Sequence, residues 1–85
     1  MPTIAVVHGI LIILYFNDHE PAHFHARGAE FHARIRIIDG SVIDVEGRMT
    51  ARHRRLLREW TLAHRNELME NWERVRAGDV PRRLD

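Results

Sequence analysis

The sequence predicts an α+β fold: a four- or five-stranded antiparallel sheet, built as a meander of hairpins, followed by a C-terminal helical region packed on one face. Two observations predict it. Hydrophobic residues tend to alternate before Thr50 and recur every three to four residues after it. Glycine-containing turns separate short apolar runs in the first half. The 85 residues, 45% of them hydrophobic and 29% charged, fit a single domain, 1–85, which divides into a sheet (1–47), a helical region (50–77) and a tail (78–85).

The first two strands are predicted from two apolar runs around the turn His8-Gly9. Residues 3–7 form the first run, and residues 10–16 form a second run that is apolar on both faces, which is typical of a buried central strand. The second run is far shorter than the roughly 20 residues that span a bilayer, and the first residues lack the basic segment of a signal peptide. We therefore expect a cytoplasmic protein without a membrane segment.

A hairpin is predicted next, with strands on either side of Gly28-Ala29. A two-residue loop that starts with glycine suits a type II′ turn, which would pair Arg27 with Glu30 and His25 with His32. The second strand alternates well, which assigns one face to the core. The inward side chains would be Phe31, Ala33, Ile35 and Ile37.

A further hairpin is predicted at Asp39-Gly40, where two registers compete. A two-residue loop would mix polar and apolar side chains on both faces, so we favour the register that takes Ser41 into the turn. That register pairs Ile37 with Ile43, Ile35 with Val45, Arg36 with Asp44 and Arg34 with Glu46. Because it neutralises both arginines, the sheet itself is a poor candidate for a nucleic-acid surface.

The helical region begins after Thr50, a residue suited to capping, and extends to about Ala77, before Gly78 and Pro81. Apolar residues recur on one stripe, which should face the sheet. The stripe comprises Leu57, Trp60, His64, Leu68, Trp72 and Val75, with Leu56, Ala63 and Met69 beside it. A straight helix of this length would measure about 42 Å and overhang the sheet. Either it breaks near Arg65-Asn66, where Asn66 would cap a second helix, or its second half packs on another subunit.

A histidine cluster is the densest concentration of chemically active groups. On a strand, His23 and His25 share a face about 7 Å apart, and the predicted hairpin brings His32 within about 5 Å of His25. Three imidazoles could hold zinc or another divalent ion. Asp18, His19 or Glu20 would then supply a fourth ligand or a hydrogen-bond acceptor behind one. The candidate metal ligands are His19, His23, His25 and His32.

The same histidines fit two other interpretations. They could act as general acid and base in RNA cleavage, with Arg27 or Arg34 binding a phosphate. They could also be the polar face of an amphipathic hairpin. The chain has no cysteine, and it lacks a glycine-rich phosphate loop and any metalloprotease spacing. Catalytic residues therefore stay unassigned, with an RNase or a metal-dependent hydrolase as the enzyme classes left open.

An arginine cluster is the second candidate binding site. It consists of Arg48, Arg52, Arg54, Arg55 and Arg58, with no acidic residue between positions 48 and 58. The net charge is only +1, so this charge is local. Cations at a helix N-terminus oppose the helix dipole, and RNA phosphates, an acidic protein or the acidic second half of another copy would relieve the repulsion. A solvated arginine face is the alternative interpretation.

The order of several short motifs resembles a bacterial family, the domain of unknown function 4160. The motifs are Met1-Pro2-Thr3-Ile4, Tyr15-Phe16-Asn17-Asp18-His19, His23-Phe24-His25-Ala26, Glu59-Trp60, His64-Arg65-Asn66-Glu67-Leu68 and Asn71-Trp72. The resemblance covers nearly the whole chain. It implies functional roles for His19, His23 and His25, whereas His32 lies outside the shared motifs. It also implies a gene arrangement similar to toxin and antitoxin pairs.

We therefore predict a small component of a toxin-antitoxin-like module that acts by protein or RNA contact through the arginine cluster, with the histidine face as a second candidate contact. The alternative is a metal-binding or metal-dependent hydrolytic domain that uses the histidines, with zinc as the expected ion. A third alternative is a structural homodimer without catalysis, because a chain of this size has little core. The expected partners are a second copy of the chain, a cognate small protein and RNA, but no membrane.

Overall fold

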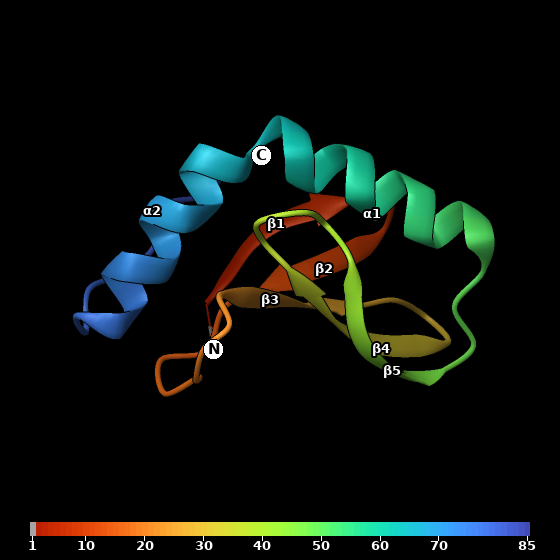
Figure 1. Cartoon of the computed structure of the whole chain (residues 1–85), viewed down its shortest axis with the longest axis horizontal. Helices are drawn as coiled ribbons and strands as arrows, with labels where there is room; N and C mark the ends of the chain where they lie inside the picture. Colours follow the sequence, from red (N-terminus) through yellow and green to blue (C-terminus); the bar gives the residue numbers. More distant parts are fainter. Residues whose placement is uncertain (1) are drawn as a thin grey trace.

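The computed structural model describes residues 2–85 and has the predicted α+β architecture, with five antiparallel strands in the order β1-β2-β3-β4-β5 followed by two helices (Figure 1). The strands are β1 (Thr3–Val7), β2 (Ile10–Ile13), β3 (His23–Arg27), β4 (Phe31–Arg36) and β5 (Val42–Gly47), and the helices are α1 (Ala51–Ala63) and α2 (Arg65–Arg76). Neither helix is long and apolar enough to cross a membrane.

The core lies mainly between one face of the sheet and α1, while α2 extends past the end of the sheet, where its Trp72 ring meets His23 with centroids 5.4 Å apart (Figure 1). Phe24 of β3 is fully buried and meets the Trp60 ring of α1 edge-on, with ring centroids 5.8 Å apart. The alternation predicted for β4 is confirmed, because Phe31, Ala33 and Ile35 are buried while the residues between them are half-buried. Since neighbouring side chains of a strand point to opposite faces, His23 and His25 lie on the face away from α1.

The β1–β2 hairpin turns at His8-Gly9, as predicted. Both residues have positive φ, 50° and 79°, which is the requirement of a type I′ turn. Strand β2 lies between β1 and β3 and is therefore interior, but it is shorter than expected and ends at Ile13. The chain from residue 14 to 22 instead forms a loop that leads into β3.

The predicted register of the β3–β4 hairpin is wrong by two residues. The loop is Ala29-Glu30, because the Gly28 N–H donates to the Phe31 carbonyl at 3.0 Å. Gly28 lacks the positive φ of a type II′ turn and instead lies beneath the Phe31 ring, which a Cβ atom would strike. The actual pairs are His23 with Arg36, Phe24 with Ile35, His25 with Arg34, Ala26 with Ala33 and Arg27 with His32. A shift of two preserves the face, so His25 and His32 stay on the same side.

The β4–β5 register also differs from both predicted alternatives. The chain turns directly after β4, because the Arg36 carbonyl accepts from the Gly40 N–H and the Arg36 N–H donates to Ser41, each at 2.8 Å. The expected pairs Arg36 with Asp44 and Arg34 with Glu46 are therefore wrong. Asp44 lies opposite Arg34 and forms an ion pair with it. A register irregularity follows, and Ile35 pairs with Val42.

The helical region is broken, as one of the two alternatives predicted. The break is at His64, which ends α1 and precedes α2, so Asn66 is inside α2 and caps nothing. Thr50 caps α1 as predicted, and its hydroxyl accepts from the His53 N–H at 3.1 Å. The predicted stripe is largely buried, although Ala63 is exposed. Two buried polar residues were not predicted, Thr61 and Asn71.

Residues 82–85 cover the open edge of β1. The Leu84 N–H donates to the Ile4 carbonyl at 2.7 Å, and the Val6 N–H donates to the Asp85 carboxylate at 3.0 Å. The buried Asn71 of α2 fixes this segment by binding both the N–H and the carbonyl of Arg82. The free backbone groups of an edge strand are thereby paired within the chain.

Candidate metal centre

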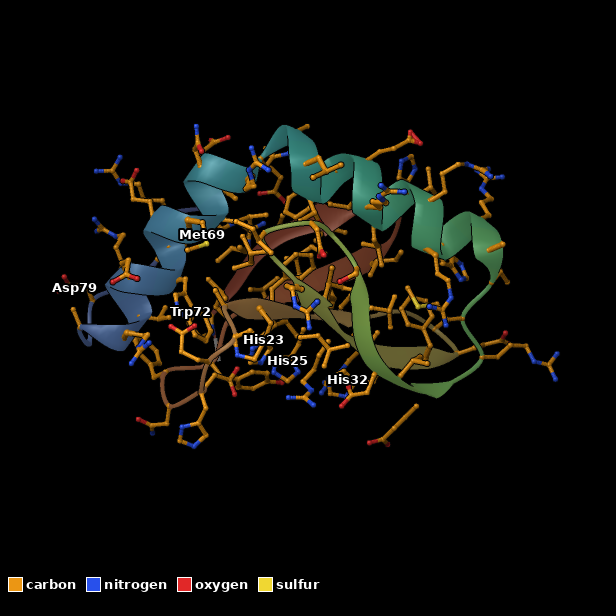
Figure 2. The ribbon with its side chains drawn as sticks, viewed as in Figure 1. His23, His25, His32, Met69, Trp72 and Asp79 are labelled. Atoms are coloured by element: carbon orange, nitrogen blue, oxygen red, sulfur yellow. The ribbon has the colours of Figure 1, made fainter. Side chains whose placement is uncertain are left out.

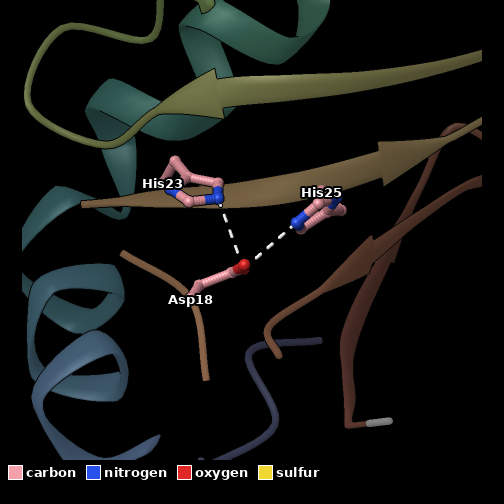
Figure 3. A group of neighbouring side chains, drawn as sticks. All are labelled: Asp18, His23 and His25. Carbon is pink, nitrogen blue, oxygen red and sulfur yellow. Dashed lines mark hydrogen bonds and ion pairs between the residues drawn. The ribbon is translucent and has the colours of Figure 1, made fainter. Parts of the chain in front are cut away.

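Asp18, His23 and His25 converge at the start of β3 (Figure 3). Figure 2 shows the two histidines of this group together with His32 on the same side of the sheet. The Asp18 Oδ2 atom lies 3.3 Å from His23 Nε2 and 3.1 Å from His25 Nε2. One ligand atom of each residue lies within 4.8 Å of the other two. Strand β3 presents the two histidines on one face, and the loop from β2 brings the carboxylate to them.

The hydrogen bond of His23 determines which of its nitrogens has a free lone pair. His23 Nδ1 lies 2.8 Å from the Pro21 carbonyl, which can only accept, so Nδ1 carries the proton. In the neutral ring, Nε2 is then an acceptor. It is buried without a hydrogen-bond partner and faces the Asp18 carboxylate, in a side chain that is only 2% exposed. Two acceptors in this position repel each other unless a proton or a metal cation lies between them.

His25 is held in a similar way. Its Nε2 faces Asp18, and its Nδ1 lies 3.1 Å from His32 Nε2. The Tyr15 ring packs edge-on against it, with centroids 4.4 Å apart. Burial is the largest influence on the pKa of His25 and lowers it below the ordinary value of 6.5, although Asp18 opposes this effect. The ring is therefore neutral at physiological pH, and its Nε2–H donates to the Asp18 carboxylate, a proton that a metal ion would displace.

The structure brings together only some of the predicted metal ligands. His23 and His25 belong to the cluster, while His32 contacts His25 and stands behind it. His19 is exposed and lies outside the cluster. Of the residues considered for a fourth ligand or a supporting role, Asp18 is central, whereas Glu20 forms an ion pair with Arg76 at 2.7 Å.

The position of Asp18 could not be obtained from strand periodicity, because Asp18 lies in an irregular loop. The only sequence signal was its proximity to the two histidines. The loop includes a cis peptide bond between Glu20 and Pro21, and the Pro21 carbonyl is the acceptor that orients His23. The local sequence therefore supplies both the carboxylate and the group that sets the tautomer.

Two imidazole nitrogens and one carboxylate oxygen form a donor set that suits divalent zinc or iron. Ligand distances of about 2.0–2.2 Å would allow one ion to contact all three atoms. The cluster borders an open hollow on the face away from α1, lined by Tyr15, Phe16, Asn17, Asp18, His25 and His32. An ion held here by three protein ligands would keep a position accessible to water or a small ligand.

The arginine cluster lies elsewhere, at the N-terminal half of α1 and the segment before it. All five arginines are exposed. Within residues 2–85, none of them forms an ion pair, whereas Arg34, Arg76 and Arg83 each contact a carboxylate. The cluster is therefore separate from the histidines. Of the two arginines considered for RNA cleavage, Arg34 lines a hollow with His25 and His32 but is paired with Asp44, and Arg27 is exposed.

Comparison with known proteins identifies the family. The profile described as Domain of unknown function (DUF4160) matches residues 9–73, which span most of the chain and include Asp18, His23, His25 and His32. No curated protein and no solved structure gave a significant match. The chain belongs to the family of domain of unknown function 4160.

Proposed function

We propose that this protein binds a divalent transition metal ion through Asp18, His23 and His25. The observation that carries the proposal is the buried, unpartnered Nε2 of His23, which faces a carboxylate oxygen 3.3 Å away. A buried polar atom without a partner is costly, by roughly 1–3 kcal/mol. A metal cation would bind the lone pair and the carboxylate together, and would convert a repulsive contact into two favourable ones.

The surroundings of both histidines support the proposal. Metal-binding histidines usually donate their second ring N–H to a nearby acceptor, which fixes the tautomer and the ring orientation. His23 has such an acceptor in the Pro21 carbonyl. For His25 the acceptor would be His32 Nε2, once the proton that now lies between His25 Nε2 and Asp18 moves to Nδ1. With both rings protonated on Nδ1, both Nε2 lone pairs would face Asp18, which is consistent with one ion.

The number of ligands favours a reactive ion over a purely structural one. Structural zinc sites have four protein ligands, whereas catalytic sites have three and bind water at the fourth position. A zinc-bound water ionises near neutral pH and can act as a nucleophile. The hollow beside Tyr15 and Asn17 would admit such a water and a small substrate. A metal-dependent hydrolytic activity is the function that this arrangement supports best.

Metal titration of the tag-free, chelator-treated protein tests the proposal. We expect one equivalent of Zn²⁺ or Co²⁺ to bind, with Co²⁺ giving the visible absorption of a four- or five-coordinate ion. Asp18→Asn and His25→Gln should each weaken binding by at least 100-fold, while the exposed His19→Gln should bind like the wild type. Titration with Fe²⁺ under anaerobic conditions identifies the preferred ion.

A second readout avoids reliance on variants of the buried His23. The ¹⁵N chemical shifts of the wild-type imidazoles distinguish the Nδ1–H tautomer from the imidazolium. We expect His23 to carry a proton on Nδ1, where the Pro21 carbonyl accepts it, and its Nε2 resonance to move when Zn²⁺ is added. Binding of less than about a tenth of an equivalent, with unchanged resonances, would refute a metal site. The toxin-antitoxin-like role and the cognate small protein stay predictions from the sequence.

A further inference from the structure

The arginine surface, defined as Arg48, Arg52, Arg54, Arg55 and Arg58, has a charge that the chain leaves uncompensated. All five side chains are exposed, and none contacts a carboxylate in the described part of the chain. The first turn of α1 contains no acidic residue. Like charges three and four positions apart on a helix repel, and cations near its N-terminus oppose its dipole. A polyanion bound across the surface would remove both penalties.

The side chains, and not the helix terminus, would make the contacts. Thr50 and His53 cap the first turn reciprocally, so the Thr50 and His53 backbone N–H groups are already paired. His53 also packs on the Phe31 ring, with centroids 4.9 Å apart. The arginines are thus carried by a helix that is anchored at its start.

The turn between β4 and β5 also packs against α1. Gly40, in the turn between β4 and β5, is buried against the backbone of Arg58, where a Cβ atom would lie 3.0 Å from Arg58 Cα. The rise of a helix places Arg54 and Arg58 about 6 Å apart along its axis. This is close to the rise of two nucleotides along one strand of a duplex, about 7 Å. An anchored helix therefore carries these cations at a spacing close to that of a phosphate backbone.

The composition of the surface favours a nucleic acid over a protein. Protein interfaces need buried aromatic or aliphatic anchors. Among the described residues of α1, Leu62, 44% exposed, is the only large apolar side chain that is exposed. Single-stranded nucleic acids are bound through aromatic stacking. Trp60 of α1 packs against Phe24 and His64, and the His53 ring packs on Phe31, so neither offers such a platform.

We propose that the arginine surface binds the phosphate backbone of a nucleic-acid duplex without reading its bases. Phosphate contacts position a protein on a duplex and carry little sequence information. Their signature is counterion release, which makes the affinity fall steeply with salt. This site is independent of the proposed metal site, since it uses none of the same residues.

Fluorescence anisotropy with a labelled 20-base-pair duplex, in DNA and RNA forms and two unrelated sequences, tests the proposal. With five phosphate contacts, the slope of log K against log salt should be about −4.5, so affinity should fall about 500-fold between 50 and 200 mM salt. The two sequences should bind equally. The double variant Arg54→Gln, Arg58→Gln should reduce the slope to about −2.7 and weaken binding about 60-fold at 0.1 M salt.

The matched control is Arg76→Gln, Arg82→Gln, which removes the same charge from exposed positions on α2 and the tail. It should bind within about threefold of the wild type. Equal losses in both variants would show that net charge alone drives binding and would refute the arginine surface. A single strand that binds more tightly than the duplex, or a dimer in sedimentation that Arg54→Gln, Arg58→Gln dissociates without any duplex binding, would also refute it.

Discussion

His32 is the residue whose part in the proposed metal site is easiest to isolate. Its Nε2 lies 3.1 Å from His25 Nδ1, so it orients the ring without facing the candidate ion. Loss of such a supporting group typically weakens metal binding 10–100-fold. We expect that loss of Zn²⁺ affinity in His32→Ala, measured by competition with a chelator, and no change in His19→Ala. An unchanged affinity in both would show that His25 is oriented without His32.

The face shared by His25 and His32 was predictable, whereas their exact pairing was not. Alternation along a strand depends only on odd and even positions, so an error of two residues leaves the face unchanged. The register itself depends on where the loop closes. The glycine at position 28 indicated a turn there, but it serves the close packing of Phe31. The sequence alone does not show whether a glycine serves a turn or the close packing of a neighbouring side chain.

The ion pair between Arg34 and Asp44 should make stability depend on acid pH. The hydrogen bond from Arg34 is the main cause that lowers the pKa of Asp44 below its ordinary value of 3.8. A carboxyl group with a lowered pKa stabilises the fold above its unfolded-state pKa, and this contribution is lost as pH falls through the folded-state pKa. Because both side chains are exposed, the effect should be small.

Thermal unfolding of Asp44→Asn checks this. Its melting temperature should lie slightly below that of the wild type at pH 7, and the difference should shrink as the pH falls through the lowered folded-state pKa of Asp44. Glu46→Gln, on the same strand and without an ion pair among residues 2–85, is the control. A difference that persists unchanged at pH 2 would assign the effect to something other than this ionisation.

At the level of elements, the most informative unpredicted feature is the link between α2 and the edge of β1. Asn71 is 1% exposed, and its amide donates to the Arg82 carbonyl at 2.8 Å and accepts from the Arg82 N–H at 2.9 Å. Asn71→Ala would leave two backbone groups without their partner. We expect a loss of about 2 kcal/mol in the free energy of unfolding by urea.

The same variant should loosen the tail. The N–H groups of Leu84 and Val6 form the hydrogen bonds between the tail and β1. Their hydrogen exchange with solvent should accelerate in Asn71→Ala. Asn66→Ala, at an exposed position of the same helix, should leave both stability and exchange near wild type. Protected amides at both positions in Asn71→Ala would show that the tail holds to β1 without Asn71.

Periodicity predicted the number and order of the elements, but not their ends. The spacing of apolar residues indicated the strands and helices, because an element with one buried face repeats its apolar residues at its own structural period. The end of β2 at Ile13, the turn after Arg36 and the helix break at His64 depend on contacts between distant segments. Asn71 was not singled out for the same reason, since its partner lies in a tail without a pattern.

For the whole molecule, the two proposed sites should act independently, because the sheet lies between the face that carries His25 and the helix α1. His25 lies on the face of the sheet away from α1, whereas the arginine surface is exposed around the start of α1. Packed layers are about 10 Å apart. The Debye length at 0.1 M salt is also about 10 Å, so a divalent ion near Asp18 should contribute little to the potential at Arg54.

Zinc at saturation should therefore change the duplex dissociation constant by less than about twofold in 0.1 M salt. Linkage requires the duplex to have an equally small effect on zinc affinity, which gives an internal check on the measurement. At 0.01 M salt, where the Debye length is about 30 Å and exceeds the spacing of the layers, zinc should strengthen duplex binding by simple charge attraction. Asp18→Asn should remove that increase. A change above about fivefold in 0.1 M salt would require a conformational link between the loop at Asp18 and α1, and would contradict two separate sites.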